Sequence, residues 1–97
     1  MSLQIRQAEF TRMIALLILF ATQRGYELTF GDAYAATGHC RNSYHYKRLA
    51  VDFNLFKNGE YLTNTTDHQE LGEFWESIGG TWGGRWDDGN HYSYGEK

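Results

Sequence analysis

The chain has 97 residues, of which 41% are hydrophobic, 16% aromatic and 22% charged. This length and composition are typical of one small folded domain, and we expect residues 1–97 to form it. The single cysteine excludes a disulfide scaffold within the chain. The formal charge of −3 at pH 7 argues against a nucleic-acid-binding protein, because such proteins contact phosphates through Lys and Arg.

Apolar segments of the chain predict neither a membrane anchor nor an export signal. None approaches the roughly 20 residues that cross a bilayer, so we expect no stable membrane insertion. The apolar segment 13–21 has the length of a secretory signal core, but Glu9 precedes it and Leu19 occupies a position where cleavage needs a small residue. We therefore expect a protein that is made in the cytoplasm without a signal peptide.

The first predicted element is a helix that ends at Gly25, where glycine supplies a left-handed cap. Its apolar residues recur at the spacing of an amphipathic helix: Phe10, Met13, Ile14, Leu17, Phe20 and Ala21. Residues 26–30 follow and alternate between apolar and polar, as in a half-buried strand.

A second strand is predicted over residues 49–56, which also alternate. Asp52 lies on the face opposite the main apolar set of this strand. The Asn58-Gly59 pair predicts a type I′ hairpin that returns through residues 61–62.

A second helix is predicted from Thr66, because Gln69 follows three residues later as in a capping box. We expect His68 to lie on the surface of this helix and glycines 79–80 to end it. Its predicted buried stripe is Leu71, Phe74, Trp75 and Ile78.

The last segment, 81–94, is rich in glycine and aromatic residues. A tight turn at residues 88–90 would lead into a short strand with His91 and Ser93 on one face. We expect Trp82 and Trp86 to be core residues, as large aromatics in small domains usually are. These elements together predict an α+β fold, with helices packed on a small antiparallel sheet.

Three residues meet the requirements of a catalytic zinc site, which takes three protein ligands and leaves a position for water. They are His45 in a loop, Asp52 on the second strand and His91 on the last strand. Spacing alone leaves open that all three are ordinary loop and strand residues. Cys40 leaves two further alternatives, a metal pair with His45 and a cysteine nucleophile.

Four motifs occur in order along the chain: Ser43-x-His45, Asp52, Trp82-Gly83-Gly84 and Asp88-x-x-His91. Together they resemble the zinc peptidase family of D-Ala-D-Ala carboxypeptidases and phage endolysin L-alanyl-D-glutamate peptidases. The similarity is strongest to a compact phage-type branch. It implies a Hedgehog/DD-peptidase-like fold and one zinc ion held by His45, Asp52 and His91. It also implies a catalytic carboxylate at Asp88, with Asp87 as the second choice.

One position departs from this family pattern. Relatives usually carry an arginine soon after the segment equivalent to residues 31–34, and this chain has Ala35 there. A developing oxyanion needs a positive donor. Arginines elsewhere could provide this positive charge as substrate-binding residues, and the candidates are Arg41, Arg48 and Arg85.

The resemblance implies a zinc-dependent peptidase that hydrolyses the stem peptide of bacterial peptidoglycan, as an endolysin-type L-alanyl-D-glutamate endopeptidase. The alternatives are a D,D-carboxypeptidase and a zinc-stabilised binding module that has lost turnover. The expected partner is the stem peptide, and we expect a monomer. It would act on the periplasmic side, at the cell wall, after the membrane has been permeabilised.

Overall fold

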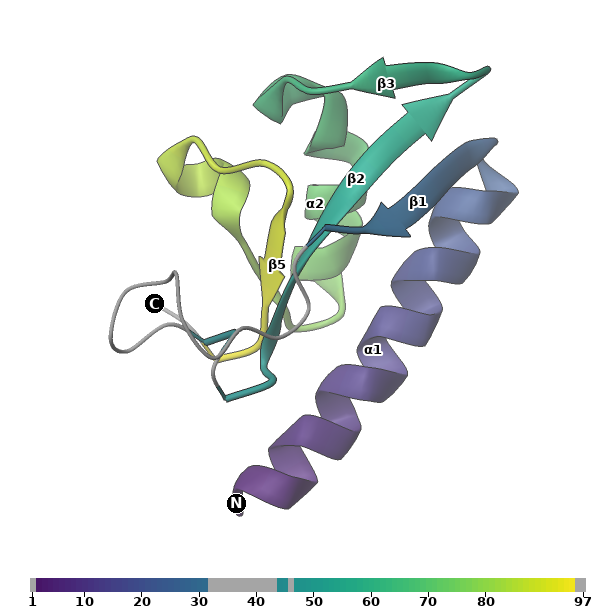
Figure 1. The fold of residues 1–97 in the computed structure, drawn as a ribbon. Helices are drawn as coiled ribbons and strands as arrows, with labels where there is room; N and C mark the ends of the chain where they lie inside the picture. Colours follow the sequence, from purple (N-terminus) through teal and green to yellow (C-terminus); the bar gives the residue numbers. More distant parts are fainter. Residues whose placement is uncertain (1, 32–43, 46, 96–97) are drawn as a thin grey trace.

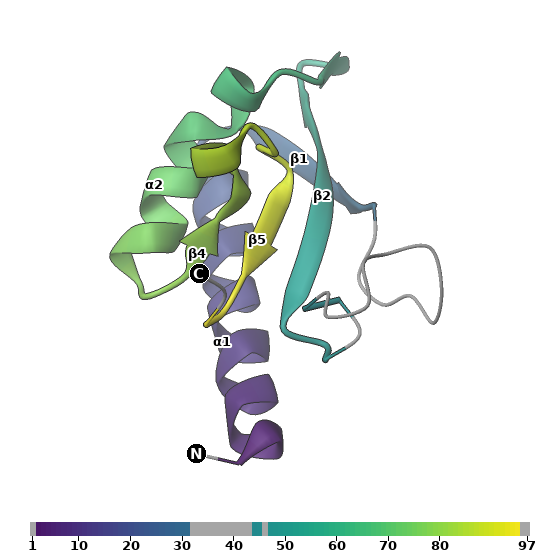
Figure 2. The ribbon, with the colours of Figure 1, turned by 90° about the vertical axis from the view of Figure 1, so that its left-hand side faces the viewer.

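The computed structural model describes residues 2–31, 44–45 and 47–95 (Figure 1). These residues form two α-helices, two short 3-10 helices and a five-stranded antiparallel sheet. The predicted α+β class is therefore confirmed. Figure 2 shows both α-helices on one side of the long strand β2.

Helix α1 (Leu3–Gln23) is longer than its apolar pattern suggested. The Ser2 side chain accepts a hydrogen bond from the Ile5 N–H and so caps a first turn that the pattern did not include. Gly25 follows the helix with φ of 84°, a left-handed conformation that favours glycine. The buried residues of α1 are Phe10, Leu17 and Ala21.

Strand β2 (Ala50–Lys57) is the centre of the sheet. Strand β1 (Tyr26–Phe30) runs antiparallel along one edge of it. The other edge pairs first with β5 (His91–Ser93) and then with β3 (Glu60–Leu62). Strand β4 (Thr81–Trp82) pairs with β5. Strand β5 pairs with residues 50–52 of β2 and β3 pairs with residues 55–57, so neither strand is in register with Phe53 and Asn54.

The alternation predicted for β2 is confirmed. Val51, Phe53 and Leu55 are buried against the helices, whereas Asp52 and Asn54 are half-buried on the other face. The predicted hairpin between β2 and β3 is also present, with positive φ at both of its turn residues (52° and 78°).

The second helix begins differently from the prediction. The capping box is formed by Asn64 and Asp67, two residues earlier than expected, and the chain enters as the 3-10 helix η1 (Thr65–His68) before α2 (Gln69–Ser77). Gly79 ends α2 with φ of 102°.

Trp75 is the centre of the core, with its side chain fully buried. Its indole N–H donates to the backbone carbonyls of Thr81 at 3.1 Å and Ser93 at 2.9 Å, so it ties α2 to β4 and β5. Trp82 is buried as expected. The expectation for Trp86 is wrong, because this ring is 45% exposed, although its centroid lies 5.8 Å from that of the His91 ring.

Candidate metal centre

Three chain segments bring the candidate ligands together. Asp52 on β2 and His91 on β5 are direct partners in the antiparallel register. Sheet pairing therefore places both side chains on the face of β2 away from the helices. His45 lies in the turn before β2. Backbone hydrogen bonds close this turn, from Arg48 N–H to the His45 carbonyl (3.1 Å) and from Leu49 N–H to the Tyr44 carbonyl (3.0 Å).

The ligand atoms converge on one carboxylate oxygen. Asp52 Oδ1 lies 3.3 Å from His45 Nε2 and 3.2 Å from His91 Nδ1. All three ligand atoms lie within 4.8 Å of one another. Zinc bonds of about 2.0–2.2 Å at tetrahedral angles separate neighbouring ligand atoms by about 3.3–3.5 Å. The two short distances match this spacing, so the arrangement can hold a metal ion.

Burial and donor chemistry also fit zinc. The His45 and His91 residues are 2% and 7% exposed, and the Asp52 side chain is 21% exposed. Two imidazoles and one carboxylate form a donor set that zinc takes in catalytic sites, with a fourth position open to water. The ligand set that the sequence resemblance implied is thus brought together in space.

Asp88 lies in the turn between the 3-10 helix η2 (Gly83–Trp86) and β5, directly before the His91 strand. Its backbone N–H donates to the Gly83 carbonyl at 2.9 Å, and its carbonyl accepts from the His91 N–H at 3.1 Å. A Cβ atom on Gly83 would lie 2.3 Å from the Asp88 carbonyl oxygen and 2.7 Å from His91 Cβ. The close packing of residue 83 against Asp88 and His91 therefore requires glycine in the tryptophan-glycine motif.

Two side chains hold the backbone of Gly89, the next residue of this turn. The Gly89 N–H donates to Thr65 Oγ1 at 3.1 Å, and the Gly89 carbonyl accepts from Trp82 Nε1 at 2.8 Å. Sequence reasoning missed Thr65, because nothing local to η1 signals that its hydroxyl reaches a turn 24 residues away. These two bonds restrict the backbone that carries Asp88.

The candidate substrate-binding arginines lie in different places. Arg85 forms a two-point ion pair with Glu76 of α2, at 2.8 and 2.6 Å. Arg48 has φ of 56° and lines an apolar pocket with Phe30 and Val51. Arg41 lies outside the described residues, as do Ala35, Cys40 and Ser43. The second-choice carboxylate, Asp87, is exposed in a left-handed conformation (φ 64°).

The surface position expected for His68 is wrong. This residue is 2% exposed, and its Nδ1 lies 2.8 Å from the hydroxyl of the buried Tyr92. Burial lowers the pKa of His68 to about 4, against the opposing effect of the Asp67 carboxylate. Burial likewise raises the pKa of the Tyr92 hydroxyl. Burial of His68 between η1 and β5 thus favours the neutral imidazole.

The chain matches the family model described as D-alanyl-D-alanine carboxypeptidase over residues 37–94. This segment covers more than half of the chain and contains all three candidate ligands and Asp88. The chain belongs to this family. Membership of this family identifies the protein as a metallopeptidase, in agreement with the cluster of His45, Asp52 and His91. A search of curated proteins found no match. Within the part that the structure describes, neither helix combines the length and apolarity needed to span a bilayer.

Proposed function

We propose that the protein is a zinc-dependent peptidase that hydrolyses the stem peptide of bacterial peptidoglycan, as an endolysin-type L-alanyl-D-glutamate endopeptidase. The observation that carries the proposal is the convergence of His45, Asp52 and His91 on one face of β2 in a chain of this peptidase family. We further propose that the chain acts as a monomer at the cell wall.

In this proposal His45, Asp52 and His91 hold the zinc ion. When bound, zinc supplies a Lewis acid that polarises a carbonyl group and favours deprotonation of water. Asp88, positioned by its backbone bonds to Gly83 and His91, accepts the proton of the attacking water and then delivers it to the nitrogen of the leaving amine. The products are a carboxylate and a free amine.

Amino-group release from purified peptidoglycan tests this function. The zinc-loaded wild type should release new amino groups, and Asp88→Ala should abolish release while retaining the metal. Glu73→Ala removes an exposed carboxylate from α2 and is the matched control, with unchanged release expected. A new N-terminal D-glutamate identifies the endopeptidase, whereas free D-alanine identifies the alternative D,D-carboxypeptidase.

The second candidate function is a zinc-stabilised binding module without turnover. It is favoured by Ala35 at the position where relatives carry arginine, and by the engagement of Arg85 with Glu76. A wild type that binds zinc and stem peptide but releases no amino groups would favour this module. A cysteine hydrolase would instead be stopped by thiol alkylation and would tolerate chelators.

A further inference from the structure

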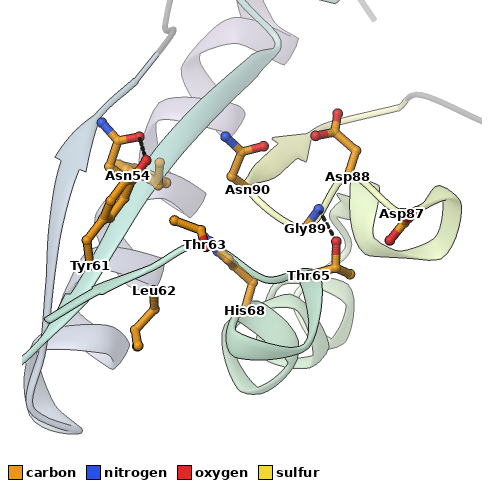
Figure 3. Close-up of a pocket in the computed structure, with 11 residues that line it drawn as sticks. Asn54, Tyr61, Leu62, Thr63, Thr65, His68, Asp87, Asp88, Gly89 and Asn90 are labelled. Carbon is orange, nitrogen blue, oxygen red and sulfur yellow. Dashed lines mark hydrogen bonds between the residues drawn. The ribbon is translucent and has the colours of Figure 1, made fainter.

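A pocket of about 190 Å³ opens near the candidate metal centre, beside the part of β2 that lies between its pairings with β5 and β3 (Figure 3). Phe53 and Asn54 of β2 form one side of it, residues of the segment 61–68 contribute a second, and the turn 87–90 contributes a third. Complete small-molecule sites usually have volumes of roughly 300–1,000 Å³. This pocket is therefore suited to one part of a larger ligand.

The pocket adjoins the proposed reaction site through two elements. Asn54 lies on the same face of β2 as Asp52, two residues further along the strand. Asp88 and Asn90 belong to the turn that leads into His91. In Figure 3 the carboxamides of Asn54 and Asn90 and the carboxylate of Asp88 all project along the upper side of the pocket. A substrate cleaved beside Asp88 would extend into this space.

Two hydroxyl groups orient the Asn54 carboxamide. Its Oδ1 accepts from the Tyr61 hydroxyl at 3.3 Å, and its Nδ2 donates to Thr29 Oγ1 at 3.2 Å. A carboxamide has two N–H donors and two acceptor lone pairs. These two bonds therefore leave one donor and one acceptor of Asn54 for a ligand. A peptide unit offers the complementary pair, one carbonyl oxygen and one N–H group.

Charge disfavours a carboxylate ligand in this pocket. The described residues that line the pocket include no Lys or Arg. They include two acidic residues, Asp87 and Asp88. His68 also lines the pocket, but its ring is neutral at physiological pH and is hydrogen-bonded to Tyr92. An uncharged segment of peptide main chain avoids the repulsion that a carboxylate group would meet there.

We propose that this pocket is a substrate subsite that binds the uncharged main chain of the peptide next to the scissile bond, through the side-chain amides of Asn54 and Asn90. The proposal rests on the proposed peptidase function. Tyr61 is a positioning residue in it, because its hydroxyl acts on the ligand only by orienting Asn54. Asn54 and Asn90 are binding residues.

Cleavage of two substrates by Asn54→Ala tests the subsite. One substrate is a full stem peptide. The other is a short peptide with no residues beyond the two that form the scissile bond. Loss of a hydrogen bond to the peptide should lower kcat/KM on the full peptide about tenfold, mainly through KM. Turnover of the short peptide, which does not reach the pocket, should fall much less than turnover of the full peptide. Gln69→Ala removes an exposed carboxamide outside the pocket and should match the wild type on both substrates.

Tyr61→Phe keeps the ring that stacks on Phe56 and removes only the orienting hydroxyl, so it tests the same idea with little risk to folding. It should raise KM for the full peptide a few-fold and leave kcat unchanged. Wild-type kinetics for both Asn54→Ala and Tyr61→Phe on the full peptide would overturn the subsite.

Binding can be measured independently of turnover by titrating isotope-labelled, zinc-loaded protein with stem peptide. The side-chain NH₂ resonances of Asn54 and Asn90 should shift, and those of Gln69 should not. Shifts without any cleavage by the wild type would support the subsite and contradict the proposed peptidase function. Cleavage without such shifts would contradict the subsite alone.

Discussion

Replacing His68 with asparagine should remove much of the acid sensitivity of the fold. The structure buries the His68 imidazole and lowers its pKa from the usual 6.5 to about 4. Between these two values the unfolded chain binds a proton that the folded protein does not bind. The free energy of unfolding must therefore fall as the pH falls from 6.5 towards 4. Above pH 6.5 this contribution is fully present.

The size of the effect follows from the shift. One pKa unit corresponds to about 1.4 kcal/mol, so the shift of His68 from 6.5 to about 4 sets a limit of about 3 kcal/mol. Between pH 7.5 and pH 5 the expected loss is about 2 kcal/mol. A domain of this size has a urea m-value of about 1–2 kcal/mol/M, so the unfolding midpoint of the wild type should fall by about 1–2 M because of His68.

Urea unfolding at several pH values, in the presence of a chelator, measures this contribution. His68→Asn keeps a polar partner for the buried Tyr92 hydroxyl but does not titrate in this range. Every other titratable group is common to both proteins, so the difference between their pH profiles isolates His68. Parallel profiles between pH 7.5 and pH 5 would refute the reasoning.

Variants at three further positions test the packing and the turn that carries the proposed catalytic carboxylate. Gly72→Ala should destabilise the fold by at least about 1–3 kcal/mol in urea unfolding, because the new Cβ would lie 2.1 Å from Trp82 Cδ2. An unfolding midpoint equal to that of the wild type would contradict this close packing of Gly72 against the Trp82 ring. Trp75→Leu should cost about 3–5 kcal/mol by the same measurement, because it leaves a cavity and removes the indole N–H that donates to the Thr81 and Ser93 carbonyls. Thr65→Val should lower kcat for peptide cleavage while zinc stays bound, because it removes the hydroxyl that accepts from the Gly89 N–H. Thr65→Ser keeps this hydroxyl and should retain the wild-type kcat. Equal kcat values for the Val and Ser variants would exclude this positioning role.

Local sequence patterns predicted the elements of the fold well. The alternation along β2 placed Asp52 on the face away from the core, and the Asn58-Gly59 pair predicted the hairpin. Both signals depend on neighbouring residues only, since side-chain direction in a strand and the twist of a two-residue turn are set locally. The capping box was misplaced by two residues because several polar residues around position 66 satisfy the same pattern.

Contacts between distant segments could not be predicted in this way. The opposition of Asp52 and His91 depends on the register of β2 against β5, which no local pattern specifies. The ligand set came only from resemblance to a known family. The burial of His68 under Tyr92 and the bond from Thr65 to the Gly89 turn likewise depend on how η1 packs against the last strand. They became visible only in three dimensions.

Zinc titration of the metal-free protein by calorimetry tests the central claim most directly. The wild type and the Glu73→Ala control should each bind one zinc ion per chain, and Asp52→Ala should lose this binding while its circular dichroism spectrum stays that of the folded protein. A wild type that binds no zinc, or an Asp52→Ala variant that binds it as tightly as the wild type, would contradict the proposed centre of His45, Asp52 and His91.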